Sequence, residues 1–238
     1  MAQHQKPEYI ESGGFIAEVI RTQRIKSADI RVEDGAVSIV VPDLLDAKRI
    51  AKLLSDKKTW INAKIRLHQE AQPTTNKSFI SGEAFPYLGR NYRLKVYSGA
   101  FNPIKLIQGQ LTVTVPGGKK NADAIRNALI HWYKEKAEAK LREKVKRNID
   151  AVGVSPRSVG IKSYKSRWGS CSAKGKVDFN WKIIMAPNHI VDYVVAHELC
   201  HLKHHDHSPK FWKAVERLIP DYANCREWLK QNGNFIQI

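Results

Sequence analysis

One cluster of histidines constrains the fold of this chain more than any other feature of its sequence. The chain has nine histidines, and six of them lie between residues 189 and 207. The run from His197 to His201 reads His-Glu-Leu-Cys-His. Residues four apart share one face of an α-helix, so the run predicts a helix that presents both imidazoles to one point. The neighbouring Val191, Val194 and Leu199 predict that this helix is buried.

Such a helix is typical of metal centres. Two imidazoles on one face can bind a zinc ion, and Glu198 lies beside them without being a ligand. We predict Zn²⁺ as the cofactor, one ion per chain, although another divalent metal suits the same ligands. Zinc lowers the pKa of a water bound to it to about 7. Glu198 is then predicted to be the general base that takes a proton from that water.

A catalytic zinc site needs a third protein ligand and an open position. We predict His207, which lies six residues beyond the second histidine of the motif. This spacing matches the long metzincin pattern, which has glycine where His204 stands. Without the glycine, the third ligand must arrive by a different path. His205 is therefore an alternative third ligand, and Glu216 and Glu227 are weaker alternatives.

The net charge of +17 predicts a negatively charged partner. Residues 1–75 carry a net charge of +2, and residues 76–238 carry +15. A field of this sign attracts nucleic acid or a phosphorylated substrate. Lysine-rich helix faces on an ordinary globular protein explain the same charge, so the charge by itself does not name the partner.

The cellular compartment is predicted from what the sequence lacks. No apolar run approaches the roughly 18 residues that a membrane span needs, and residues 1–11 contain no apolar core of a secretion signal. The three cysteines lie far apart, which favours reduced thiols. We therefore expect a cytoplasmic protein that does not interact with membranes.

The order of predicted elements indicates an α+β fold, with an N-terminal β-rich module and long helices. We expect three parts: residues 1–75 form a β-meander and a long helix capped by Asp43, residues 76–120 form a second β-rich segment, and residues 121–238 form the metal-binding domain. Residues 72–78 are expected to be a linker. In the last part, the pattern predicts a helix over 121–151, strands over 157–164 and 176–184, and helices over 187–205, 208–218 and 222–232.

A polar loop between the last two strands is predicted to face the substrate. Arg167 can hold a carboxylate or a phosphate with two hydrogen bonds. Ser166, Trp168 and Ser170 surround it in the sequence. An alternative is that the loop only connects the strands and that Trp168 belongs to the core. An oxyanion could receive a hydrogen bond from any of three tyrosines, namely Tyr164, Tyr193 and Tyr222.

Together these motifs resemble one known family, the YgjP-like predicted metal-dependent hydrolases, which are bacterial zincins. The resemblance rests on Lys165 to Cys171, Asn180-Trp181, Tyr193 to Leu202, His207-Ser208 and Phe211-Trp212. It implies a zincin-like catalytic domain with His197, His201 and His207 as ligands and Glu198 as the base. It also implies kinship with SprT-like and Wss-type proteases, which digest DNA–protein crosslinks.

Three functions remain to be separated. We expect a zinc metallopeptidase, in which the strand over 176–184 is an edge strand that binds an extended peptide. The second is a metal-dependent phosphohydrolase of the nucleotide pyrophosphatase type, which the positive charge and Arg167 favour. The third is a nucleic-acid-binding module with a structural metal, completed by Cys200 or His205 as a fourth ligand.

Overall fold

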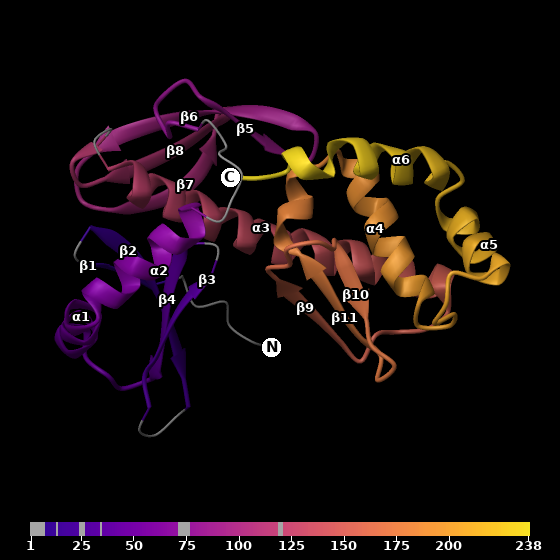
Figure 1. The fold of residues 1–238 in the computed structure, drawn as a ribbon, viewed down its shortest axis with the longest axis horizontal. Helices are drawn as coiled ribbons and strands as arrows, with labels where there is room; N and C mark the ends of the chain where they lie inside the picture. The colour runs from indigo at the N-terminus through magenta and orange to yellow at the C-terminus, as the bar shows by residue number, and fades with distance from the viewer. Residues whose placement is uncertain (1–7, 13, 24–26, 34, 71–76, 119–120) are drawn as a thin grey trace. The chain divides into compact units, whose positions relative to one another are not determined.

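The computed structural model describes residues 8–12, 14–23, 27–33, 35–70, 77–118 and 121–238. These residues form three small sheets and several helices, so the predicted α+β class is confirmed (Figure 1). The chain forms two compact units that alternate along the sequence. The first unit comprises the described parts of residues 1–83 and 93–132 together with Ile238, and the second comprises residues 84–92 and 133–237.

The first sheet of the first unit has the strand order β1-β2-β4-β3. Its strands are β1 (Glu8–Ser12), β2 (Phe15–Thr22), β3 (Asp29–Glu33) and β4 (Ala36–Pro42). The predicted antiparallel meander is wrong, because β2 and β4 are parallel neighbours and β1 was not predicted. The two most apolar strands take the centre of the sheet, where their side chains are covered best, and the more polar β1 and β3 take the edges.

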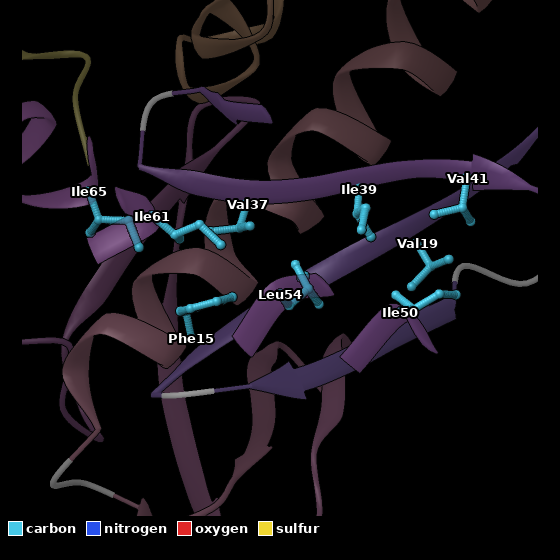
Figure 2. Packing of buried hydrophobic residues seen from close by; sticks show 10 residues of the cluster. Phe15, Val19, Val37, Ile39, Val41, Ile50, Leu54, Ile61 and Ile65 are labelled. Atoms are coloured by element: carbon cyan, nitrogen blue, oxygen red, sulfur yellow. The ribbon is translucent and has the colours of Figure 1, made fainter. Parts of the chain in front are cut away.

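Two helices cover one face of this sheet and close a hydrophobic core (Figure 2). They are α1 (Ala47–Asp56) and α2 (Lys58–Glu70), so the single long helix predicted here is divided at Lys57. The predicted cap at Asp43 is wrong, because Asp46 caps α1 by accepting a hydrogen bond from the backbone N–H of Arg49 at 2.7 Å. The core contains Phe15, Ala17, Val19, Val37, Ile39, Val41, Ile50, Leu54, Ile61 and Ile65.

A second sheet has the order β5-β6-β8-β7. Its strands are β5 (Ala84–Tyr87), β6 (Arg90–Ser98), β7 (Asn102–Ile107) and β8 (Gln110–Val115), which confirms the β-rich segment expected after residue 76. The helix predicted over 121–151 is also confirmed as α3 (Ala122–Val152), and it contributes residues to both units. The three-part division of the chain stays a prediction. Residues 72–76 of the predicted linker lie outside the described residues.

The second unit contains the third sheet, in the order β10-β11-β9. Its elements are β9 (Ser158–Lys162), β10 (Gly169–Cys171), β11 (Lys176–Asn180), the 3-10 helix η2 (Trp181–Met185), α4 (Asn188–Cys200), α5 (Pro209–Leu218), α6 (Tyr222–Asn232) and the 3-10 helix η3 (Gly233–Phe235). Strand β10 lies inside the segment predicted to be a loop. Its three residues are too few to give a periodic signal in the sequence.

The position of β10 corrects the edge-strand prediction. Strand β11, which covers the first part of the predicted strand 176–184, lies in the centre of the sheet, and residues 181–185 form η2. The buried Val177 and Phe179 explain why β11 takes the central position. The edge next to α4 is instead β10, since these two elements are in contact. Among the described helices, none is both long and apolar enough to cross a membrane.

Candidate metal centre

Helix α4 brings the first two histidines together. Its apolar residues, including Ile190, Val194 and Leu199, are fully or almost fully buried and fix the helix in the second unit. His197 lies in the last turn, and His201 caps the C-terminus in a helical conformation. One turn therefore separates the two rings, and their centroids are 4.9 Å apart.

The third histidine comes from the connection between α4 and α5. The chain leaves the helix with the backbone N–H of His204 bonded to the carbonyl of Cys200 at 3.0 Å, and it then turns back toward α5. His207 lies just before α5, which begins with Pro209 at its first position. The path does not need the glycine of the metzincin pattern, because His204 is not among the described residues with a positive φ.

The three rings converge closely enough to share one ion. One ligand atom from each of His197, His201 and His207 can be chosen so that all three lie within 4.8 Å of one another. The Nε2 atoms of His197 and His207 are 3.2 Å apart. Two nitrogens bound tetrahedrally to zinc at 2.0–2.1 Å are about 3.3 Å apart, so this pair fits a zinc ion. Among the described residues, His205 is not part of the group and is exposed.

The protonation state of the rings also suits a metal. Burial, and after it the adjacent imidazoles of His201 and His207, lower the pKa of His197 to about 3. Burial lowers the pKa of His201 as well. His201 uses Nδ1 to bond the carbonyl of His204 at 2.9 Å, which orients its ring and leaves Nε2 for an ion. Neutral imidazoles are the form that binds zinc, so the residues present fit the predicted metal.

We expect His207→Ala to weaken zinc binding by more than about 100-fold. Loss of a residue that only hydrogen-bonds to a metal ligand already weakens metal binding 10–100-fold, and loss of a ligand costs more. The matched variant His205→Ala should leave the affinity unchanged, since His205 is outside the cluster. Competition with a zinc-binding dye measures both affinities. Equal losses in the two variants, or a loss in His205→Ala alone, would show that the third ligand is assigned wrongly.

Aromatic residues from α5 and α6 support the rings of the site. Phe211 stacks on His201, with centroids 4.4 Å apart and an angle of 26° between the planes. Trp212 stacks on His207, with centroids 5.5 Å apart and an angle of 23° between the planes, and Tyr222 stacks on Trp212 at 5.3 Å. The contact between Trp212 and His207 has no signal in the sequence, because it depends on the turn between α4 and α5.

Trp212→Ala is expected to weaken zinc binding about 10-fold, because His207 lies outside a regular helix and depends on this stacking for its orientation. Trp212→Phe should retain most of the affinity, since a smaller ring still covers His207. The same dye competition measures the effect. If Trp212→Ala binds zinc as tightly as the unmodified chain while it remains folded, Trp212 does not position His207.

Glu198 belongs to α4, and its side chain lies against Gly169 of strand β10. Its side chain is buried, with 7% of the residue exposed. A Cβ atom added to Gly169 would lie 2.5 Å from Glu198 Cγ, so only glycine leaves room for this carboxyl group. Burial raises the pKa of Glu198 to about 8, against the opposite effect of the positive charge of Arg167. A carboxyl group held this way can exchange a proton near neutral pH.

The predicted substrate residues lie on and before β10. Ser166 and Arg167 are exposed, and the Arg167 guanidinium lies over the ring of Tyr164 at 5.5 Å. Ser170 on β10 shares a hydrogen bond of 2.9 Å with the hydroxyl of Tyr164. Trp168 is half-buried and lies against Gly233. The structure therefore gathers these side chains around β10, and their contact with a substrate stays a prediction.

The other tyrosines considered for an oxyanion have different surroundings. Tyr193 is buried, its ring is 5.8 Å from that of His197, and burial raises the pKa of its hydroxyl to about 12. This hydroxyl therefore keeps its proton and remains a hydrogen-bond donor at neutral pH. Tyr222 stacks on Trp212 instead.

Cys200, considered as a fourth ligand of a structural metal, is not part of the described histidine cluster. Burial also raises the pKa of its thiol to about 11.

Comparison with known proteins agrees with this geometry. The model of the YgjP-like metallopeptidase domain matches residues 26–232, which is most of the chain and includes the histidine helix and β10. The chain belongs to this family. The resemblance predicted from the motifs is thereby confirmed, and membership implies a metal-dependent hydrolase that uses a divalent ion.

Comparison with solved structures finds a similar metallopeptidase, whose overall similarity to the chain is low. The chain is similar to the metallopeptidase zymogen abylysin of Pyrococcus abyssi, known from a crystal structure, at 24% sequence identity and a TM-score of 0.35. The alignment covers 38% of this chain and 93% of abylysin. No curated protein matches the chain.

Proposed function

We propose that the chain is a zinc-dependent peptidase with His197, His201 and His207 as ligands and Glu198 as the general base. One observation carries the proposal. Three imidazoles lie close enough to share one ion, and Glu198, which follows His197 in the same helix, is a buried carboxyl group facing an edge strand. Among the described residues, the cluster offers three ligands, namely His197, His201 and His207. A closed structural zinc site needs four protein ligands, so we expect the fourth position of the ion to be open to water or substrate.

When bound, zinc would polarise the scissile carbonyl and lower the pKa of a coordinated water. The residues of the chain supply the proton transfers. Glu198 takes the proton of the attacking water and then donates it to the amine that leaves, so one carboxyl group acts first as general base and then as general acid. The room left by Gly169 allows the carboxyl group to stay beside β10 during both transfers.

Strand β10 supports a peptide as the substrate. It pairs with β11 on one side, and its other side is not paired with any strand in the part of the chain that the structure describes. An extended peptide can add to such an edge through backbone hydrogen bonds. Because a Cβ atom at Gly169 would reach Glu198, a peptide on β10 is brought close to the general base.

The exposed guanidinium of Arg167 near Glu198 favours the second candidate, a hydrolase of phosphate esters. The test is one zinc-loaded preparation assayed on an unfolded casein-like protein and on a panel of nucleoside triphosphates. Release of peptides that stops after removal of zinc by a chelator is expected, with no release of phosphate. Zinc-dependent release of phosphate without peptide cleavage would overturn the proposal in favour of the phosphohydrolase.

A further inference from the structure

One face of the second sheet has a composition that neither the metal centre nor the proposed peptidase explains. The register pairs Lys95 on β6 with Thr112 on β8, and Thr112 with Lys105 on β7. In the same way, Thr114 on β8 is paired with Tyr97 on the neighbouring strand β6 and with Asn102 on the other neighbouring strand, β7. Residues paired across a sheet point to the same side, so these six side chains share one face. We call it the outer face of the β6-β8-β7 sheet, whose strands are labelled in Figure 1.

This outer face is polar and hollowed, whereas the opposite face is buried. Leu94 and Leu111 belong to the core and are nearly inaccessible. On the outer face the structure has a hollow of about 280 Å³. Its lining residues include Lys95, Tyr97, Asn102, Lys105, Gln110 and Thr112.

The charge of the face has a single sign. Residues 84–122 contain six basic side chains and no aspartate or glutamate. None of the described residues that line the hollow is acidic. Lys95 and Lys105 lie on β6 and β7 with β8 between them, a separation of roughly 10 Å between the two strands. Two cations on one face without a neutralising carboxylate favour a partner with a repeated negative charge.

An exposed aromatic ring lies between these charges and the end of β6. Tyr97 is 46% exposed, which is high for a large side chain in a strand, and the amino group of Lys95 is 5.4 Å from the centre of its ring. Amide and hydroxyl side chains surround it, namely Asn102, Gln110, Thr112 and Thr114. An aromatic ring beside lysines and hydrogen-bonding side chains on a sheet suits an unpaired base and its phosphates.

We propose that the outer face of the β6-β8-β7 sheet binds single-stranded nucleic acid, with a base stacked on Tyr97 and phosphates bound by Lys95 and Lys105. A double helix hides its bases from such a ring, so single strands bind more tightly than duplexes. The surface lies in the first unit and needs no metal, so it is independent of the proposed peptidase.

The test uses fluorescence anisotropy of the full chain with labelled oligo-dT, oligo-U and a DNA duplex. Binding of one or both single strands, tighter than that of the duplex, is expected, and the two oligomers separate DNA from RNA. Tyr97→Ala should weaken single-strand binding about 10-fold, and Tyr97→Phe should restore it because phenylalanine also stacks. Tyr97 is exposed, so both variants are expected to fold, which circular dichroism verifies.

Salt dependence tests the two lysines. The logarithm of the binding constant falls as the logarithm of the salt concentration rises. The double variant Lys95→Ala/Lys105→Ala should make this fall less steep by about 1.4, because each phosphate contact to a single strand contributes about 0.7 to the slope. The control Lys48→Ala/Lys52→Ala removes the same charge from exposed positions on α1 and should leave the slope unchanged. Equal slopes in the two double variants, equal binding of duplex and single strand, or binding unaffected by Tyr97→Ala would overturn the proposal.

Discussion

Glu198→Gln is expected to reduce turnover by about 10²–10⁴-fold, because it removes the group that accepts and returns the proton. Zinc binding should be retained, since the three imidazoles are unchanged and glutamine has nearly the same shape as glutamate. Glutamine is neutral and buried at this position, so the fold should tolerate it. Steady-state cleavage of an unfolded protein substrate measures the loss, and elemental analysis measures the zinc content.

The matched control is Glu216→Gln on α5, which is exposed and outside the described histidine cluster. It should retain full activity and full zinc content. Activity that persists in Glu198→Gln at the level of this control would show that the carboxyl group is not the base. Loss of zinc together with activity would instead make Glu198 a part of the metal site.

Gly169→Ala is expected to reduce activity by about 10²-fold or more, because the new methyl group takes the space of the Glu198 carboxyl group. The added Cβ atom would be 2.5 Å from Cγ and 2.7 Å from Oε1 of Glu198, so the side chain must move. A displacement of about 1 Å at a catalytic group can cost 10²-fold in rate. Overpacking should also lower the free energy of unfolding by about 1–3 kcal/mol.

A double variant separates this explanation from general damage to β10. Gly169→Ala/Glu198→Ala removes the side chain that the new methyl group meets, so its free energy of unfolding should exceed that of Gly169→Ala alone. Chemical denaturation of the single and double variants measures this coupling. If the two destabilisations simply add, Gly169 acts through the backbone of β10 and not through Glu198.

The sequence predicted well what depends on local spacing. A separation of four residues on a helix places His197 and His201 on one face wherever that helix lies. The apolar pattern likewise predicted α3 and the α5 and α6 helices close to their observed ends. Prediction from the sequence failed for the strand order, which depends on pairing between segments that are distant in the chain. Strands β2 and β4 became parallel neighbours, and β11 became central, because the best-covered positions of a sheet go to its most apolar strands.

At the candidate site, spacing along the chain was enough to predict which groups are present: two imidazoles on one helix face, a carboxyl group beside them, and further histidines shortly afterwards. Which later histidine joins them depends on packing, because the turn after α4 brings His207 to the first two rings and leaves His205 outside the cluster. Packing also decided that Gly169 faces Glu198 and that Trp212 stacks on His207. Such contacts join segments that no local periodicity relates, so they are fixed only when the whole unit packs.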